Sequence, residues 1–120
     1  MSKIILGIES TAHTAAVGII TSEGEILSNQ RLMYIPKEGG IHPREAARHH
    51  SDNFPLLFKR ALEEASLVPL DIDLVSYARG PGLGPCLRTG ATSARAFAYM
   101  HKIPLIGVNH CVAHLEIGLL

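Results

Sequence analysis

The sequence predicts one α/β domain with a mixed sheet, in which a three-stranded antiparallel meander is followed by helix, strand, helix, strand and helix. Three observations support this class. Short apolar runs separated by tight polar turns fill residues 3–34, as in strands joined by hairpins. Amphipathic or alanine-rich stretches cover residues 43–66 and 87–101, and each precedes a short apolar run. A chain of 120 residues has room for a single domain.

The composition excludes several classes of protein. An apolar share of 47% suits an ordinary globular core, and 11 basic residues balance 11 acidic ones, so overall charge predicts neither nucleic-acid nor membrane binding. No apolar run approaches the roughly 20 residues that span a bilayer, and the run after Lys3 is too short for a secretory signal. Cys86 and Cys111 lack the spacing of a disulfide framework. We therefore expect a cytoplasmic protein with reduced thiols.

The first three strands are predicted at residues 3–8, 15–20 and 26–34. The first is rich in isoleucine and is expected to be central in the sheet. The turn at residues 9–14 gathers a carboxylate, three hydroxyl groups and an imidazole at the end of this strand. Two interpretations stay open for this turn: a hairpin held by its own hydrogen bonds, or a ligand-binding segment.

A long amphipathic helix is predicted from Pro43, a residue that suits the first helical position. Apolar residues then recur at spacings of three and four up to Ala65. Pro55 is expected to kink this helix, because its ring clashes with the carbonyl group four residues earlier. His49 and His50 are adjacent and point in different directions on a helix, so we assign them to the surface or to packing.

A fourth strand is predicted at residues 72–77, followed by a glycine-rich turn at 80–85 and a helix at 87–101. The turn matches neither the Walker loop nor the dinucleotide-binding fingerprint. A glycine-rich turn before a helix N-terminus can nevertheless cradle an anion. The helix carries small residues that allow close packing on a sheet: Gly90, Ala91, Ala94, Ala96 and Ala98.

The last predicted strand, at residues 103–108, leads into a helix that begins near Asn109 as its N-cap. His110 and His114 then lie one turn apart on the same face, close enough to share one metal ion. Spacing alone does not establish a metal site, and two ligands are too few. Cys111 points away from His110 on a helix, so a further ligand must come from elsewhere. Because the chain ends soon afterwards, at Gly118-Leu119-Leu120, we expect it to be one lobe of a larger assembly.

Four motifs in this order closely resemble the N-terminal part of the universal tRNA threonylcarbamoyladenosine synthase family, the catalytic subunit of the KEOPS complex, formerly described as O-sialoglycoprotein endopeptidase or glycoprotease. The resemblance covers essentially the whole chain, and His13-Thr14 places it with the archaeal or eukaryotic branch. The motifs are Gly7-Ile8-Glu9-Ser10-Thr11-Ala12-His13-Thr14, Gly39-Gly40-Ile41-His42-Pro43, Gly80-Pro81-Gly82-Leu83-Gly84-Pro85 and Asn109-His110-Cys111-Val112-Ala113-His114.

The resemblance implies the two-lobed fold of actin-like ATPases (RNase H-like), with residues 1–120 as a single N-terminal lobe and the second lobe absent. It implies transfer of threonylcarbamoyl from threonylcarbamoyl-AMP to the adenosine beside the anticodon of ANN-decoding tRNAs. His110 and His114 match the family's ligands for iron or zinc. Glu9, Thr11 and His13 fall on the turn that faces the cleft, as contributors to positioning or proton transfer.

The resemblance also implies what this chain lacks. The third, acidic metal ligand and most of the adenylate or ATP pocket belong to the second lobe, so we expect no activity from this chain alone. The implied partners are tRNA and KEOPS-type subunits, namely a kinase-like subunit and a small dimerising subunit. An isolated lobe is also expected to self-associate through exposed apolar surface.

Two other functions remain as alternatives. A metallopeptidase would use the paired histidines, but such helices place a glutamate directly after the first histidine, where this chain has Cys111. A non-catalytic lobe would instead dock other proteins through the helices near residues 43–66 and 87–101.

Overall fold

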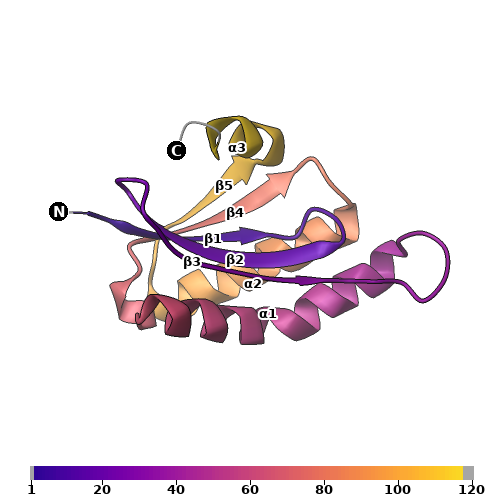
Figure 1. The fold of residues 1–120 in the computed structure, drawn as a ribbon, viewed down its shortest axis with the longest axis horizontal. Helices are drawn as coiled ribbons and strands as arrows, with labels where there is room; N and C mark the ends of the chain where they lie inside the picture. Colours follow the sequence, from indigo (N-terminus) through magenta and orange to yellow (C-terminus); the bar gives the residue numbers. More distant parts are fainter. Residues whose placement is uncertain (1, 118–120) are drawn as a thin grey trace.

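The computed structural model describes residues 2–117, which form a five-stranded mixed sheet and three α-helices (Figure 1). The predicted class and element order are confirmed. In chain order the elements are β1 (Ile4–Glu9), β2 (Thr14–Thr21), β3 (Ile26–Met33), α1 (Pro43–Ala65), the short 3₁₀ helix η1 (Pro69–Asp71), β4 (Leu74–Gly80), α2 (Gly84–His101), β5 (Leu105–Asn109) and α3 (His110–Ile117).

The strand order across the sheet is β3-β2-β1-β4-β5. β1, β2 and β3 form the predicted antiparallel meander, whereas β4 and β5 join the sheet parallel to β1. Because β1, β4 and β5 run in the same direction, their carboxyl ends lie at one edge of the sheet. This is the edge at which ligands bind in open α/β sheets.

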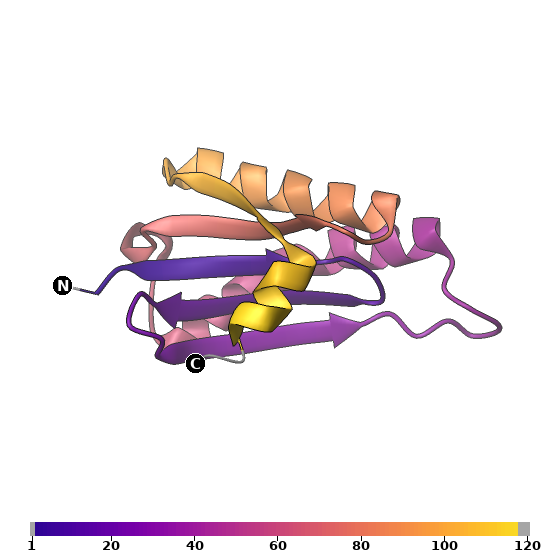
Figure 2. The same cartoon turned by 90° about the horizontal axis from the view of Figure 1, so that it is seen from above.

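The sheet is covered unequally on its two faces. α1 and α2 pack side by side on one face, and α3 alone lies over the other (Figures 1 and 2). The core between the sheet and the two long helices contains Leu6, Val17, Phe54 and Leu57, all fully buried. Burying each such side chain contributes about 1.5–3 kcal/mol, so this layer supplies the stability that fixes the strand ends.

α1 begins at Pro43 as predicted and continues through Pro55 without interruption over 23 residues. His50 on this helix is fully buried, whereas His49 is partly exposed. This confirms the assignment of the pair to packing and surface. The helix ends at Ser66, which adopts the left-handed conformation with φ of 57°.

Three predicted elements have boundaries that are wrong by two or three residues: the fourth strand, the helix after the glycine-rich turn, and the last strand, which is predicted at 103–108 and observed at Leu105–Asn109. β4 occupies Leu74–Gly80, because Ile72 caps η1 by donating its N–H to the Pro69 carbonyl. α2 begins at Gly84, because Pro85 stands in its first turn, where no N–H is needed. The glycine-rich turn is therefore shorter than predicted.

Neither cysteine forms a disulfide: Cys86 is buried and Cys111 is exposed, and both are free thiols. Within residues 2–117, no helix is both long enough and apolar enough to cross a bilayer. The expectation about Gly118-Leu119-Leu120 lies outside the described residues.

We predict that Gly90→Ala destabilises the fold by about 1–3 kcal/mol, as over-packing does in well-packed interiors. A Cβ atom at this position would lie 2.2 Å from the Ser10 hydroxyl oxygen. The free energy of unfolding in urea measures the effect. Gly84→Ala is the matched control, because a Cβ there meets nothing within 4 Å. Equal stabilities of the two variants would show that α2 does not need this close approach.

Candidate active site

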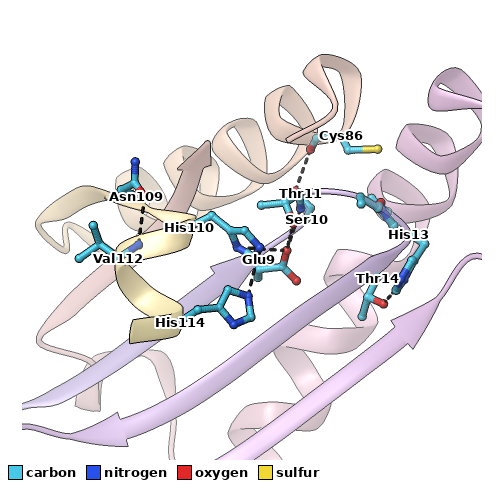
Figure 3. A network of polar contacts seen from close by, with 12 residues as sticks. Glu9, Ser10, Thr11, His13, Thr14, Cys86, Asn109, His110, Val112 and His114 are labelled. Carbon is cyan, nitrogen blue, oxygen red and sulfur yellow. Dashed lines mark hydrogen bonds and ion pairs between the residues drawn. The ribbon is translucent and has the colours of Figure 1, made fainter. Parts of the chain in front are cut away.

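The predicted site residues surround a cavity of about 330 Å³ at the carboxyl edge of the sheet (Figure 3). Two segments far apart in the sequence form it: the β1–β2 turn with the strand ends beside it, and the first two turns of α3. The lining consists of Glu9, Thr11, Ala12, His13, Thr14, His110 and His114. The β1–β2 turn is held by its own hydrogen bonds and also faces a cavity. The hairpin interpretation and the ligand-binding interpretation therefore do not exclude each other.

α3 brings its histidines to β1 by folding back over the sheet. β5 is separated from β1 by β4, so Asn109 alone could not reach Glu9. α3 instead runs from the end of β5 across the open face toward β1 and β2 (Figure 2). Its start is fixed by the predicted N-cap: the Val112 N–H donates to Asn109 Oδ1 over 3.1 Å.

The two imidazoles converge as the spacing predicts. The Nε2 atoms of His110 and His114 are 3.1 Å apart, and the rings meet edge to face with centroids 4.4 Å apart. Two nitrogen ligands of one tetrahedral zinc ion, each about 2.0–2.1 Å from the metal, are about 3.3 Å apart. The pair therefore fits two positions of a metal coordination shell.

Glu9 lies on the other side of the His110 ring. Its Oε1 atom is 4.0 Å from His110 Nδ1, and the two side chains are 35% and 26% exposed. At this distance the two atoms are too far apart for a hydrogen bond, but the negative charge of the carboxylate favours the ring hydrogen on Nδ1, which leaves the Nε2 lone pair free for a metal. Both side chains are partly exposed, so this contact contributes little to stability and serves mainly to orient the ring.

The Glu9 carboxylate is held by the turn that follows it. The Thr11 N–H donates to Glu9 Oε1 over 2.9 Å, and the Thr11 hydroxyl donates a short hydrogen bond to the same atom. His13 is the outlying member of the predicted set. Its Nδ1 atom is 2.6 Å from the Thr14 hydroxyl oxygen, and it lies away from His110 (Figure 3).

A complete set of metal ligands is not found within residues 2–117, where no three His, Cys, Asp or Glu side chains cluster suitably. Cys111 is exposed beside His110 and does not join the pair. The donors present thus fit a metal that takes two imidazoles here and further ligands from another part of an assembly.

The residues that hold the β1–β2 turn are not predictable from local sequence patterns. The Ser10 hydroxyl donates to the Cys86 carbonyl over 2.7 Å, and the Leu83 N–H donates to the Thr11 carbonyl over 2.8 Å. A Cβ at Gly82 would lie 2.6 Å from that same carbonyl oxygen. The glycine-rich turn, for which the sequence predicts a shape able to cradle an anion, contacts the β1–β2 turn through Leu83 and Gly82.

The buried thiol of Cys86 is not equipped as a nucleophile. Burial raises the pKa of Cys86 above its ordinary value, which favours the unreactive thiol over the thiolate. The ionisable groups that line the cavity are the three imidazoles and the Glu9 carboxylate.

A family model described as tRNA N6-adenosine threonylcarbamoyltransferase matches residues 25–120. A protein of that name from Ignicoccus hospitalis is 62% identical over 114 residues, which cover 95% of this chain and 35% of the relative. Another of that name, from Methanopyrus kandleri, is 60% identical over 116 residues, which cover 96% of this chain and 34% of the relative. This chain thus spans about a third of the length of these relatives.

Solved structures show the same architecture at low sequence identity. YeaZ from Pseudomonas aeruginosa superposes with a TM-score of 0.70 at 17% identity, covering 89% of this chain and 44% of that one. RuvC from Thermus thermophilus, solved with a Holliday junction substrate, gives a TM-score of 0.57 at 10% identity, covering 91% and 66%. The fold is that of an actin-like ATPase (RNase H-like) lobe, as expected.

We predict that the isolated chain binds Zn²⁺ weakly through His110 and His114, and that Glu9→Gln weakens this binding about tenfold. The neutral amide lacks the negative charge that the Glu9 carboxylate places 4.0 Å from His110 Nδ1. Titration calorimetry measures the affinity, and Glu23→Gln, in the β2–β3 turn, is the control. Unchanged affinity in Glu9→Gln would show that Glu9 does not support metal binding by His110, and unchanged affinity in His114→Ala would show that the histidine pair does not bind the metal.

Proposed function

The chain belongs to the tRNA N6-adenosine threonylcarbamoyltransferase family, and we propose that it forms the N-terminal lobe of such an enzyme. The reaction transfers threonylcarbamoyl from threonylcarbamoyl-AMP to N6 of the adenosine beside the anticodon in ANN-decoding tRNAs. One observation carries the proposal: His110, His114 and Glu9 converge on one cavity from segments about 100 residues apart.

The chemistry required is acyl transfer to an amine. The N6 nitrogen attacks the carbamoyl carbon, the bond from that carbon to the phosphate oxygen breaks, AMP leaves, and N6 loses one proton. Glu9 is the group we assign to that proton. Its Oε1 atom accepts both hydrogen bonds from Thr11, and Oε2 accepts none from the residues that the structure describes, so Oε2 is the atom that can take it.

We propose that His110 and His114 hold a divalent metal, iron or zinc, through their Nε2 atoms. When bound, the metal acts as a Lewis acid that polarises the carbamoyl oxygen. Thr11 fixes the Glu9 carboxylate beside His110, and His13 contributes to positioning at the far end of the cavity. The third ligand would be acidic and would come from the second lobe.

The remainder of the active site is proposed to lie in that second lobe. Residues 1–120 would act as a single lobe, and the adenylate or ATP pocket would form only when the second lobe closes over the carboxyl edge of the sheet. We therefore propose that this chain is inactive by itself. KEOPS-type subunits, kinase-like and small dimerising, are the proposed protein partners.

The metallopeptidase alternative gains no support from the geometry. The position after His110 holds the exposed Cys111, and Glu116 is also exposed on α3. The general base of a metallopeptidase helix is therefore missing where it is required.

The proposed function is tested with a chimera in which residues 1–117 replace the matching segment of the Methanopyrus kandleri relative. We predict that it restores threonylcarbamoyladenosine to the tRNA of a strain lacking the family enzyme, and that His110→Ala with His114→Ala lowers the modification at least a hundredfold. Mass spectrometry of digested tRNA measures it. His101→Ala, on α2, is the control. Wild-type modification in the double variant would refute the metal role.

Self-association is predicted for the isolated chain. Leu115, Ile26 and Ile117 are 76%, 62% and 55% exposed, and the latter two line one hollow on the sheet face that α3 only partly covers. Light scattering over a range of concentrations measures the mass. We expect Leu115→Gln with Ile26→Gln to reduce association, whereas Leu70→Gln, on η1, leaves it unchanged. A monomer at high concentration would contradict this prediction.

A further inference from the structure

His50 is a histidine that the proposed chemistry does not use, and it is fully buried between α1 and the sheet. Its Nε2 atom lies 2.6 Å from the carbonyl oxygen of Ala12, in the middle of the β1–β2 turn. A carbonyl oxygen can only accept a hydrogen bond, so Nε2 must carry the hydrogen. The tautomer of this ring is therefore set by the main chain of the turn that carries Glu9.

The second nitrogen of the ring is also engaged. His50 Nδ1 lies 3.1 Å from His49 Nδ1. In a neutral ring with hydrogen on Nε2, the Nδ1 atom is an acceptor, so His49 must donate. Burial lowers the pKa of His49 below its ordinary value, which favours the neutral ring. No carboxylate in the described residues forms an ion pair with His50, and a buried charge without a partner is unfavourable.

The turn is thus held at three consecutive residues. Contacts from α2 and the loop before it hold Ser10 and Thr11, through the Cys86 carbonyl and the Leu83 amide. His50 holds Ala12 from α1. Thr11, in the centre of this segment, is the residue that donates two hydrogen bonds to Glu9.

We propose that His50 is a positioning residue: as the neutral tautomer with hydrogen on Nε2, it fixes the β1–β2 turn from the α1 side, so that Thr11 keeps the Glu9 carboxylate beside His110. Its significance for catalysis rests on the proposed function. His50 does not line the cavity and takes no direct part in the chemistry.

Nuclear magnetic resonance of the ¹⁵N-labelled chain, without metal or tRNA, tests the proposal. The ring nitrogen shifts of His50 should show hydrogen on Nε2 and none on Nδ1. In His50→Leu, the Thr11 and Leu83 amides should exchange roughly fivefold to tenfold faster, as expected for loss of one hydrogen bond. His50→Gln places an N–H at a similar reach and should restore slow exchange. His49→Gln, which keeps the Ala12 contact, is the control.

Three results would overturn the proposal: hydrogen on Nδ1 of His50, unchanged exchange in a folded His50→Leu variant, or failure of His50→Gln to restore slow exchange. If His50→Leu does not fold, as judged by circular dichroism, the tautomer and His50→Gln decide the matter. In the chimera, His50→Leu should lower tRNA modification about tenfold and His50→Gln should recover it. An inactive wild-type chimera would refute the proposed function and leave the exchange result standing.

Discussion

The close approach of α2 to the end of β1 is the constraint on which the site depends. Cβ atoms at Gly82 and Gly90 would lie 2.6 Å from the Thr11 carbonyl oxygen and 2.2 Å from the Ser10 hydroxyl oxygen. Neither glycine needs a left-handed backbone, so both are required for space alone. Because the helix can come this near, its Cys86 carbonyl and the Leu83 amide reach the turn. The β1–β2 turn is therefore positioned by helix packing as well as by its own hairpin.

Local features of this fold were predictable from the sequence, and non-local ones were not. The Asn109 cap and the convergence of His110 and His114 depend on helix geometry over five or six residues, so spacing was sufficient. The meander followed from turn residues and apolar runs. The proximity of Glu9 to His110 depends on the path of α3 over the sheet, which no local pattern encodes. The roles of Gly82 and His50 also depend on tertiary contacts. Local sequence alone could therefore suggest only anion binding for the glycine-rich turn, and not its packing against Thr11.

Architecture and chemistry are shared with different sets of proteins. YeaZ and RuvC share this fold at 17% and 10% sequence identity. The fold is therefore retained in proteins whose sequences are largely different. Fold similarity at that level carries no argument about the reaction. The archaeal relatives at about 60% identity indicate the family, and the functional proposal rests on the residues at the carboxyl edge of the sheet.

The helix that carries the paired imidazoles has no buried side chain. Eight residues are too few for a helix to be stable by propensity alone, and packing contributes little here. If α3 binds the proposed metal, part of the binding free energy goes into ordering this segment, so the apparent affinity is reduced by the fraction of molecules in which it is already formed. Contacts that a neighbouring domain makes with the exposed side of α3 would raise that fraction. Metal loading and domain docking would consequently be thermodynamically coupled, each strengthening the other by the same factor.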